Sequence, residues 1–292
     1  MKVINALQKD EPALSFEFFP PKTEKGEGTL LAVVSELKKF KPDFVSVTCG
    51  AMGSTHEKTF YWIKQIKERC GLEPVAHLTC AGIDQDGIIK QINQLEKLGV
   101  DNILALRGDP PAGQDKFVAP ENGFNYAREL VALIKRHSKK ICIGVAGYPE
   151  GHPEAPSIEI DIEHLKEKVE AGADYIITQL FFDNRYFFDF QARCKKAGIN
   201  IPIIPGIMPI TSMKQMGKIT GSCGASVPGK LFSKLEQHSA DPEAIKRMGV
   251  EHTVAQCQEL LEAEVPGLHF FVMNQAGPIT QILSQVKSFL RQ

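Results

Sequence analysis

Short apolar runs rich in β-branched residues recur along the chain, each bounded by turn residues, and each predicts a β-strand. Eight such runs cover residues 14–19, 43–49, 74–80, 102–106, 141–146, 175–180, 201–205 and 269–273. Their apolar character is nearly continuous, which is typical of strands covered on both faces.

Stretches with apolar residues at three- and four-residue spacing separate these runs and predict amphipathic helices. They cover residues 29–40, 88–98, 125–137, 162–171 and 278–290, and two more are expected near 211–219 and 241–263. Gly99 and Gly172 follow two of these stretches and supply helix stop signals.

Strand followed by helix, repeated eight times, predicts a single-domain α/β protein, a (β/α)8 or TIM barrel. We expect this one domain to fill residues 1–292 and to leave no length for a further C-terminal domain. The alternative is an open doubly wound sheet, which would favour a G-x-G-x-x-G motif after a strand, and the sequence has none.

Composition narrows the functional classes. The 34 basic and 35 acidic side chains leave a net charge of −1, so no bulk positive field attracts nucleic acid or anionic lipid. No apolar run approaches the roughly 20 residues of a membrane helix, and the N-terminus lacks the features of a signal peptide. The seven scattered cysteines contain no C-x-x-C pair. We therefore expect a cytoplasmic protein with no nucleic-acid or membrane partner and no metal site.

In such barrels the chemistry lies at the carboxyl ends of the strands. Polar groups and glycines gather at the predicted strand ends to a degree that packing alone does not explain. They are Glu17, Thr48, Cys49, Gly50, His77, Thr79, Arg107, Gly108, Asp109, the 147–154 segment, Thr178, Gln179, Gly206, Asn274 and Gln275.

Glu17 is the most informative of these residues because it stands among Phe16, Phe18 and Phe19. Burial of a carboxylate in apolar surroundings raises its pKa, and a raised pKa suits a general acid near neutral pH. The alternative is a glutamate held in a buried ion pair.

The Arg107-Gly108-Asp109 segment combines a cation, a flexible glycine and an anion. Asp109 would counter a developing cation, and Arg107 would hold a phosphate or an electron-rich ring. The alternatives are a surface turn with a local ion pair and, weakly, an adhesion tripeptide.

Three further residues have two interpretations each. His152 lies in a rigid loop rich in proline and glycine and is either a ligand contact or a capped turn residue. His77 is either a cofactor contact or a hydrogen-bonded core histidine. Lys168 stands mid-helix and by default belongs to a solvated face.

The 224–230 segment, GASVPGK, has the spacing of a phosphate-binding P-loop. We reject this function because Leu231 replaces the required Ser or Thr and no strand directly precedes the segment.

Seven motifs together resemble the methylenetetrahydrofolate reductase family. They are FEFFPPKT (16–23), SVTCGA (46–51), AHLTC (76–80), LRGDP (106–110), YPEGHPEA (148–155), ITQLFFD (177–183) and IPGIMP (204–209). The resemblance runs from about residue 14 to residue 290 in the family's order.

The resemblance implies a barrel with non-covalent FAD that reduces 5,10-methylenetetrahydrofolate to 5-methyltetrahydrofolate, with NADH or NADPH as the reductant. Glu17 is similar to the general acid that protonates N10 of the folate, and Asp109 to the carboxylate that binds the pterin. The implied flavin contacts are Thr48, His77, Arg107, Gly108, Asp109, Tyr126, Ala127, Tyr148, His152, Ala155, Asp161 and Lys168. This moves Lys168 from the solvated face to a contact with the cofactor.

The same resemblance assigns folate contacts to Gln179, Gln215 and Gln275, and Gln179 would also meet the nicotinamide. Two positions depart from the family. Gln275 stands where an arginine is common, and Ile219 stands where some bacterial members have an aromatic residue. Both leave folate affinity and the choice of reductant open.

The resemblance to a flavin reductase also sets expectations for partners. A homo-oligomer is expected. Without a C-terminal regulatory domain, we expect no inhibition by S-adenosylmethionine. One alternative function is a flavin- or folate-binding subunit that takes electrons from a partner protein. Another is a lysine Schiff-base lyase, but no predicted strand ends in a lysine.

Overall fold

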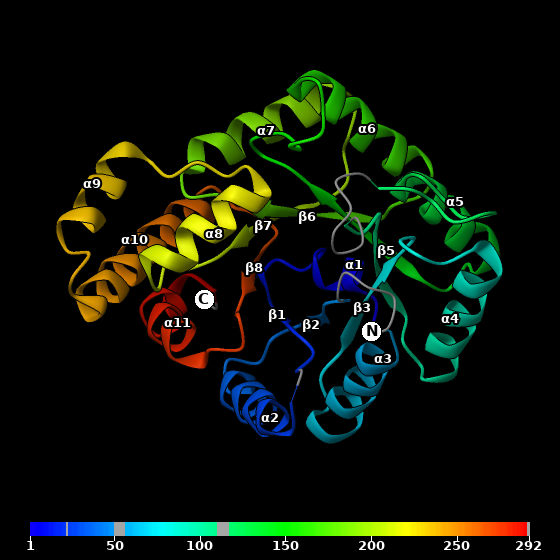
Figure 1. Ribbon diagram of the computed structural model, residues 1–292, viewed down its shortest axis with the longest axis horizontal. Coiled ribbons are helices and arrows are strands. Elements are labelled where there is room, and N and C mark those ends of the chain that lie inside the picture. Colours follow the sequence, from blue (N-terminus) through cyan, green and yellow to red (C-terminus); the bar gives the residue numbers. More distant parts are fainter. Residues whose placement is uncertain (22, 50–55, 110–116, 291–292) are drawn as a thin grey trace.

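The computed structural model describes residues 1–21, 23–49, 56–109 and 117–290. Eight parallel strands close into a barrel in sequence order, with β1 paired to both β2 and β8 (Figure 1). The strands are β1 (Ala13–Phe18), β2 (Phe44–Val47), β3 (Pro74–Thr79), β4 (Asn102–Leu106), β5 (Cys142–Gly147), β6 (Tyr175–Leu180), β7 (Ile203–Ile207) and β8 (Gly267–Phe271). All eight predicted strands and the TIM barrel are confirmed.

The predicted helices are present around the barrel (Figure 1). They are α2 (Glu24–Lys38), α4 (Gln85–Lys97), α5 (Ala127–His137), α6 (Ile158–Glu170), α8 (Met213–Cys223), α10 (Pro242–Glu262) and α11 (Ala276–Leu290). Side-chain oxygens of Thr23, Asp84 and Ser157 accept backbone hydrogen bonds at the starts of α2, α4 and α6. Such N-caps satisfy amide groups that the helix itself leaves without partners.

The sequence pattern missed four helical segments. They are α1 (Val3–Ala6), α3 (His56–Gln65) with the π-helical turn η1 (Ile66–Cys70), α7 (Asn184–Lys196) and α9 (Gly229–Gln237). In α7 the buried Phe187, Phe190 and Cys194 have helical spacing. The neighbouring Tyr186 and Phe188 hide that spacing, because they place further aromatic rings beside it.

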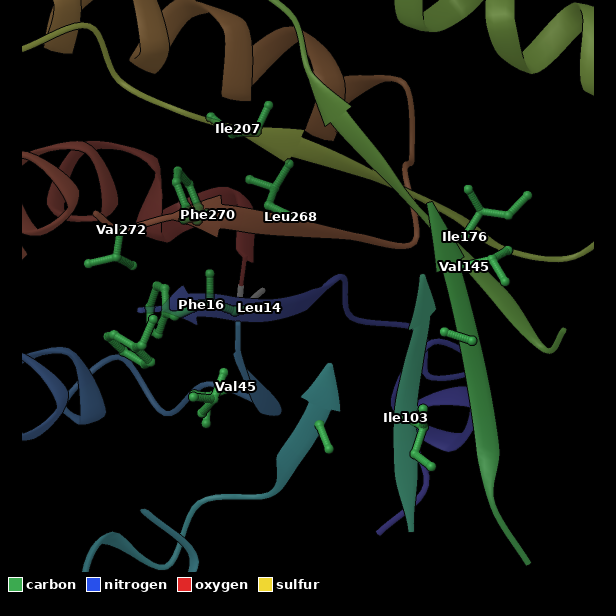
Figure 2. Close-up of a cluster of buried hydrophobic side chains, with 14 of the residues drawn as sticks. Leu14, Phe16, Val45, Ile103, Val145, Ile176, Ile207, Leu268, Phe270 and Val272 are labelled. Atoms are coloured by element: carbon green, nitrogen blue, oxygen red, sulfur yellow. The ribbon is translucent and has the colours of Figure 1, made fainter. Parts of the chain in front are cut away.

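The main hydrophobic core lies between the strands and the surrounding helices. Phe18 of β1 belongs to it. So do Phe16, Val45, Ile103 and Phe270, which Figure 2 labels. Successive strand residues face opposite sides. Ser15 and Glu17 therefore face the barrel interior, where they meet groups from other strands.

A second cluster fills the barrel interior near the end where the strands begin. Phe44, Leu104 and Tyr175 lie in it, and Val3 and Ala6 of α1 complete it. The backbone N–H of Val3 donates to Oδ1 of Asn102 at 2.8 Å in a buried hydrogen bond. Helix α1 thus covers the end of the barrel where the strands begin, which leaves the opposite end for ligands.

A third cluster joins α8, α9 and the start of α10 to the ends of β6 and β7. It contains Phe182, Met208, Met216, Leu235 and Ile245. Among the helices of the described residues, none combines the length and the apolar character that crossing a bilayer requires.

Candidate active site

A cavity of about 610 Å³ opens at the carboxyl ends of β3, β4 and β5. Its volume lies within the roughly 300–1,000 Å³ that is typical of small-molecule sites. The ends of these strands, the loops that follow them, the start of α5 and one side of α6 as far as Lys168 form its walls. The lining residues include Cys49, Thr79, Ala81, Ala105, Leu106, Arg107, Gly108, Asp109, Tyr126, Ala127, Arg128, Ala146, Tyr148, His152, Glu154, Ala155, Asp161, His164, Glu167 and Lys168.

Most residues that the sequence assigned to a flavin meet in this cavity. Arg107, Gly108, Asp109, Tyr126, Ala127, Tyr148, His152, Ala155, Asp161 and Lys168 all line it. Thr48 and His77 are not among its lining residues, although their chain neighbours Cys49 and Thr79 are. The arrangement brings these groups together, and their binding roles stay predictions.

Arg107 forms an ion pair across the cavity. Two nitrogens of its guanidinium donate to the two carboxylate oxygens of Glu154, at 2.6 and 2.8 Å. These hydrogen bonds raise the pKa of Arg107 and lower that of Glu154. The local ion pair with Asp109, one of the alternatives for this segment, is therefore replaced by a contact with a distant loop. Glu154 belongs to the predicted 147–154 segment, but its pairing with Arg107 was not predicted, because nothing in the sequence links two strand-end loops 47 residues apart.

Lys168 is half-buried, so the solvated-face interpretation is wrong. Its Nζ donates to the carbonyl oxygen of Ala146 at 2.6 Å. Burial lowers the pKa of Lys168 to about 8, although the charge of Asp161 opposes that change. Helix α6 thus turns this ammonium toward the end of β5 rather than toward solvent.

The loop after β5 is held in one conformation by contacts of its own residues. The backbone N–H of His152 donates to Oδ2 of Asp161 at 3.2 Å, and Nδ1 of His152 accepts from the backbone N–H of Glu154 at 3.1 Å. The ring of Tyr148 packs edge-on against His152 at 4.6 Å between centroids. Burial raises the pKa of Tyr148 to about 12 and lowers that of His152. His152 therefore both supports its turn and lines the cavity.

Glu17 projects into the barrel interior, and its side chain is 8% exposed. Its Oε2 accepts a hydrogen bond from Oγ of Ser46 at 3.3 Å and lies 3.4 Å from Nε2 of both His77 and His269. Burial alone would raise the pKa of Glu17, but the charges and hydrogen bonds of the two imidazoles outweigh burial and lower it to about 2.

The expected raised pKa of Glu17 is therefore wrong for this structure. The phenylalanines beside Glu17 in the sequence point away from the barrel interior, because neighbouring strand residues face opposite sides. The alternative that foresaw a buried ion pair describes the surroundings of Glu17 better. His269 was not predicted as its partner, although a histidine inside an apolar strand was a usable signal.

Comparison with known proteins identifies the family. The family model described as "Methylenetetrahydrofolate reductase" matches residues 2–287. The chain belongs to this family.

Individual relatives agree with the family match. The 5,10-methylenetetrahydrofolate reductase of Salmonella typhimurium is 40% identical over 263 residues, which cover 90% of this chain and 86% of that protein. Methylenetetrahydrofolate reductase (NADH) 1 of Arabidopsis thaliana is 38% identical over 94% of this chain. This chain spans only 48% of the plant protein, about half its length.

A solved structure shares the barrel at much lower identity. A Clostridium thermocellum protein, described as binding two copies of 5-methyl-5,6,7,8-tetrahydrofolic acid, superimposes with a TM-score of 0.67. Its sequence is 15% identical, and the match covers 97% of this chain and 96% of that one. The similarity supports the fold.

Of the residues that the reductase family resemblance assigned to folate, Asp109 lines the main cavity, whereas Gln179, Gln215 and Gln275 are not among its lining residues. Oε1 of Gln179 accepts from the backbone N–H of Leu180 at 2.9 Å. Gln215 and the exposed Gln275 line a small separate hollow beside Phe271. Oε1 of Gln215 also accepts hydrogen bonds from Thr211.

The structure also describes Ile219, which departs from the family pattern, and the rejected P-loop segment. Ile219 packs in the apolar cluster that includes Met216. Gly229 begins α9, and helix α8 rather than a strand precedes the rejected P-loop segment. The motif residues 22, 50, 51 and 110 lie outside the described residues.

Proposed function

We propose that this protein binds FAD in the main cavity and uses NADH or NADPH to reduce 5,10-methylenetetrahydrofolate to 5-methyltetrahydrofolate. The observation that carries the proposal is the cavity at the carboxyl ends of the strands. Ten of the twelve residues assigned to a flavin converge there from separate segments of a chain that belongs to this reductase family.

The chemistry of the lining residues fits a flavin dinucleotide. Ala81, Ala105 and Ala146 give part of the wall a smooth, apolar surface suited to a flat ring. The ammonium of Lys168 has three hydrogens, and one of them is directed to Ala146. The remaining N–H groups of this half-buried cation suit a phosphate oxygen.

Two other cations would support the same anionic group. Arg107 and Arg128 both line the cavity and are paired with Glu154 and Glu167. When bound, FAD would carry a hydride from the nicotinamide to the folate. The cations would neutralise its pyrophosphate, and the aromatic ring of Tyr126, 53% exposed, would cover one edge of the site.

Glu17 and Asp109 would serve the folate half of the reaction. Glu17 would deliver a proton to N10 of the folate while the methylene carbon–N10 bond breaks, and the electron pair of that bond would remain on N10. Asp109 would face the positive charge that develops at N5.

The decisive experiment separates the two half-reactions. The purified protein, with FAD added, should show a flavin spectrum that NADH or NADPH bleaches without oxygen. Methylenetetrahydrofolate should then restore the spectrum. Failure to bind FAD would overturn the proposal, whereas binding without bleaching by either nicotinamide would favour the subunit served by a protein electron donor.

Glu17→Gln should retain bleaching by the nicotinamide but lose about 10²- to 10⁴-fold in the rate of reoxidation by folate. Glu163→Gln, on the exposed side of α6, is the matched control and should leave both rates unchanged. Reoxidation of Glu17→Gln at the wild-type rate would remove Glu17 from the acid role.

A further inference from the structure

The 224–230 segment, GASVPGK, binds an anionic group of its own chain. The backbone N–H of Ser226 donates to both carboxylate oxygens of Glu150, at 3.1 and 3.0 Å. The hydroxyl of Ser226 also donates to Oε2 of the same carboxylate. Although the segment lacks the features of a nucleotide-binding loop, it therefore binds a carboxylate that lies 76 residues away in the sequence.

Glu150 belongs to the first of two consecutive tight turns after β5. The backbone N–H of Gly151 donates to the carbonyl oxygen of Tyr148 at 3.0 Å, and Gly151 has φ +86°. In the second turn, the backbone N–H of Ala155 donates to the carbonyl oxygen of His152 at 2.9 Å. Hydrogen bonds over this spacing are typical of β-turns. Tyr148, His152 and Ala155 line the main cavity, so both turns contribute to its wall.

The second turn also contacts the 224–230 segment, through Pro153. Gly224 follows α8 and has φ +74°, and a Cβ at this position would lie only 3.2 Å from Cγ of Pro153. Ordinary carbon contacts are about 3.5–4.0 Å. The absence of a side chain at Gly224 thus allows the two segments to approach closely, and each turn of the 148–155 loop meets the 224–230 segment.

The 224–230 segment is itself anchored on the side away from the loop. Ala225 is 7% exposed and belongs to the third hydrophobic cluster, against which Val227 also packs. Met216 of α8 and Leu235 of α9 are members of the same cluster. The segment is therefore a fixed support, and the 148–155 loop is attached to it.

Resting on the proposed function, we propose that Glu150 and Ser226 are positioning residues for the cofactor. Neither is among the residues that line the cavity, so they would act through Tyr148, His152 and Ala155, which do. Their contact restrains the 148–155 loop before FAD arrives. A loop that is already ordered loses less conformational freedom on binding, and the affinity for the ligand rises accordingly.

A purely structural contact would behave differently. It would contribute to the stability of the protein without FAD and leave the affinity for FAD unchanged. Thermal unfolding of the FAD-free protein measures the first quantity, and FAD titration by fluorescence quenching measures the second. The two measurements on the same variants therefore separate the two roles.

Glu150→Ala removes the whole contact and should bind FAD about 3- to 10-fold more weakly than the wild type. Ser226→Ala keeps the backbone N–H and should show a smaller loss, which also provides the test if Glu150→Ala does not fold. Ser226→Thr keeps the hydroxyl and should retain wild-type affinity. The matched controls are Glu163→Ala, on the exposed side of α6, and Ser222→Ala. The hydroxyl of Ser222 donates only within α8, to the carbonyl oxygen of Ile219 at 2.9 Å, so this control should bind FAD normally.

The double variant Glu150→Ala/Ser226→Ala checks that the two residues act through one contact. It should bind FAD no more weakly than Glu150→Ala alone, because the first substitution already removes the partner of Ser226. Additive losses would overturn the inference. Wild-type FAD affinity in Glu150→Ala and Ser226→Ala would also overturn it, whatever their Tm. A wild-type protein that binds no FAD would overturn the proposed function instead.

Discussion

A methyl group at position 108 would test how tightly the loop after β4 is constrained. Gly108 has φ +88°, a left-handed conformation that costs a residue with a side chain about 1–2 kcal/mol. A Cβ there would lie 2.8 Å from Cβ of Ala81 and 3.1 Å from Cβ of Thr79. Ordinary carbon contacts are about 3.5–4.0 Å. The loop would therefore have to move outward by about 1 Å, and overpacking of this kind costs about 1–3 kcal/mol.

Gly108→Ala should therefore lower the free energy of unfolding by about 2–5 kcal/mol. The matched control is Gly82→Ala in the neighbouring loop, because Gly82 has φ +70° but a Cβ there would meet nothing within 4 Å. The control carries the backbone strain alone, about 1–2 kcal/mol. The difference of about 1–3 kcal/mol corresponds to a Tm difference of roughly 2–10 °C.

Thermal unfolding and FAD titration by fluorescence quenching measure the two consequences of Gly108→Ala. Arg107 and Asp109 flank the substituted residue, so we expect at least about tenfold weaker flavin binding, equivalent to about 1.4 kcal/mol. Adding Ala81→Gly should recover part of the stability by removing the closer of the two carbon contacts, the methyl group of Ala81. A Gly108→Ala protein as stable as Gly82→Ala, with wild-type flavin affinity, would refute the reasoning.

Three further predictions test other parts of the structure. Burial lowers the pKa of Lys168 to about 8, so FAD affinity in titrations should fall as pH rises through 8. Lys168→Gln should bind more weakly below pH 8, and retention of the wild-type pH dependence would contradict the assignment. Gly249→Ala should destabilise by at least about 1–3 kcal/mol, because its Cβ would lie 1.8 Å from the carbonyl oxygen of Ile210. In the control Gly217→Ala, the new Cβ would meet nothing within 4 Å. This variant should raise the free energy of unfolding by about 0.5–1 kcal/mol in urea unfolding. A Gly249→Ala protein more stable than Gly217→Ala would show that the close packing at Gly249 is wrong. Despite its burial, two imidazoles lower the pKa of Glu17 from 4.5 to about 2, so its stabilisation should be complete above pH 4.5 and lost as pH falls toward 2. In Glu17→Gln, the free energy of unfolding should change less with pH between 4.5 and 2 than in the wild type. The same pH dependence in both proteins would exclude a contribution from Glu17.

Much of the fold could be predicted because its signals are local. A strand buried on both faces is mostly apolar, so β4 and β6 stand out in the sequence with the bounds that the structure shows. Helix α7 was missed because its buried phenylalanines have aromatic neighbours, and spacing then no longer separates the inner face from the outer.

The candidate site likewise has features that the sequence predicted and features that it did not. The positions of Arg107 and Asp109 beside one cavity followed from a strand-end motif, since the fold places strand ends together. Lys168, on α6, was expected there only from the family resemblance. The partner of Arg107 and the surroundings of Glu17 did not follow, because both depend on which side chains face each other across separate loops and strands.

The sequence by itself therefore determined the barrel, its family and many of the residues that line the main cavity. Only the tertiary structure decided the charge state of those residues. A pKa depends on the groups within a few ångströms of the side chain. For Glu17 those groups are Ser46, His77 and His269 from three other strands, and not the phenylalanines next to it in the chain.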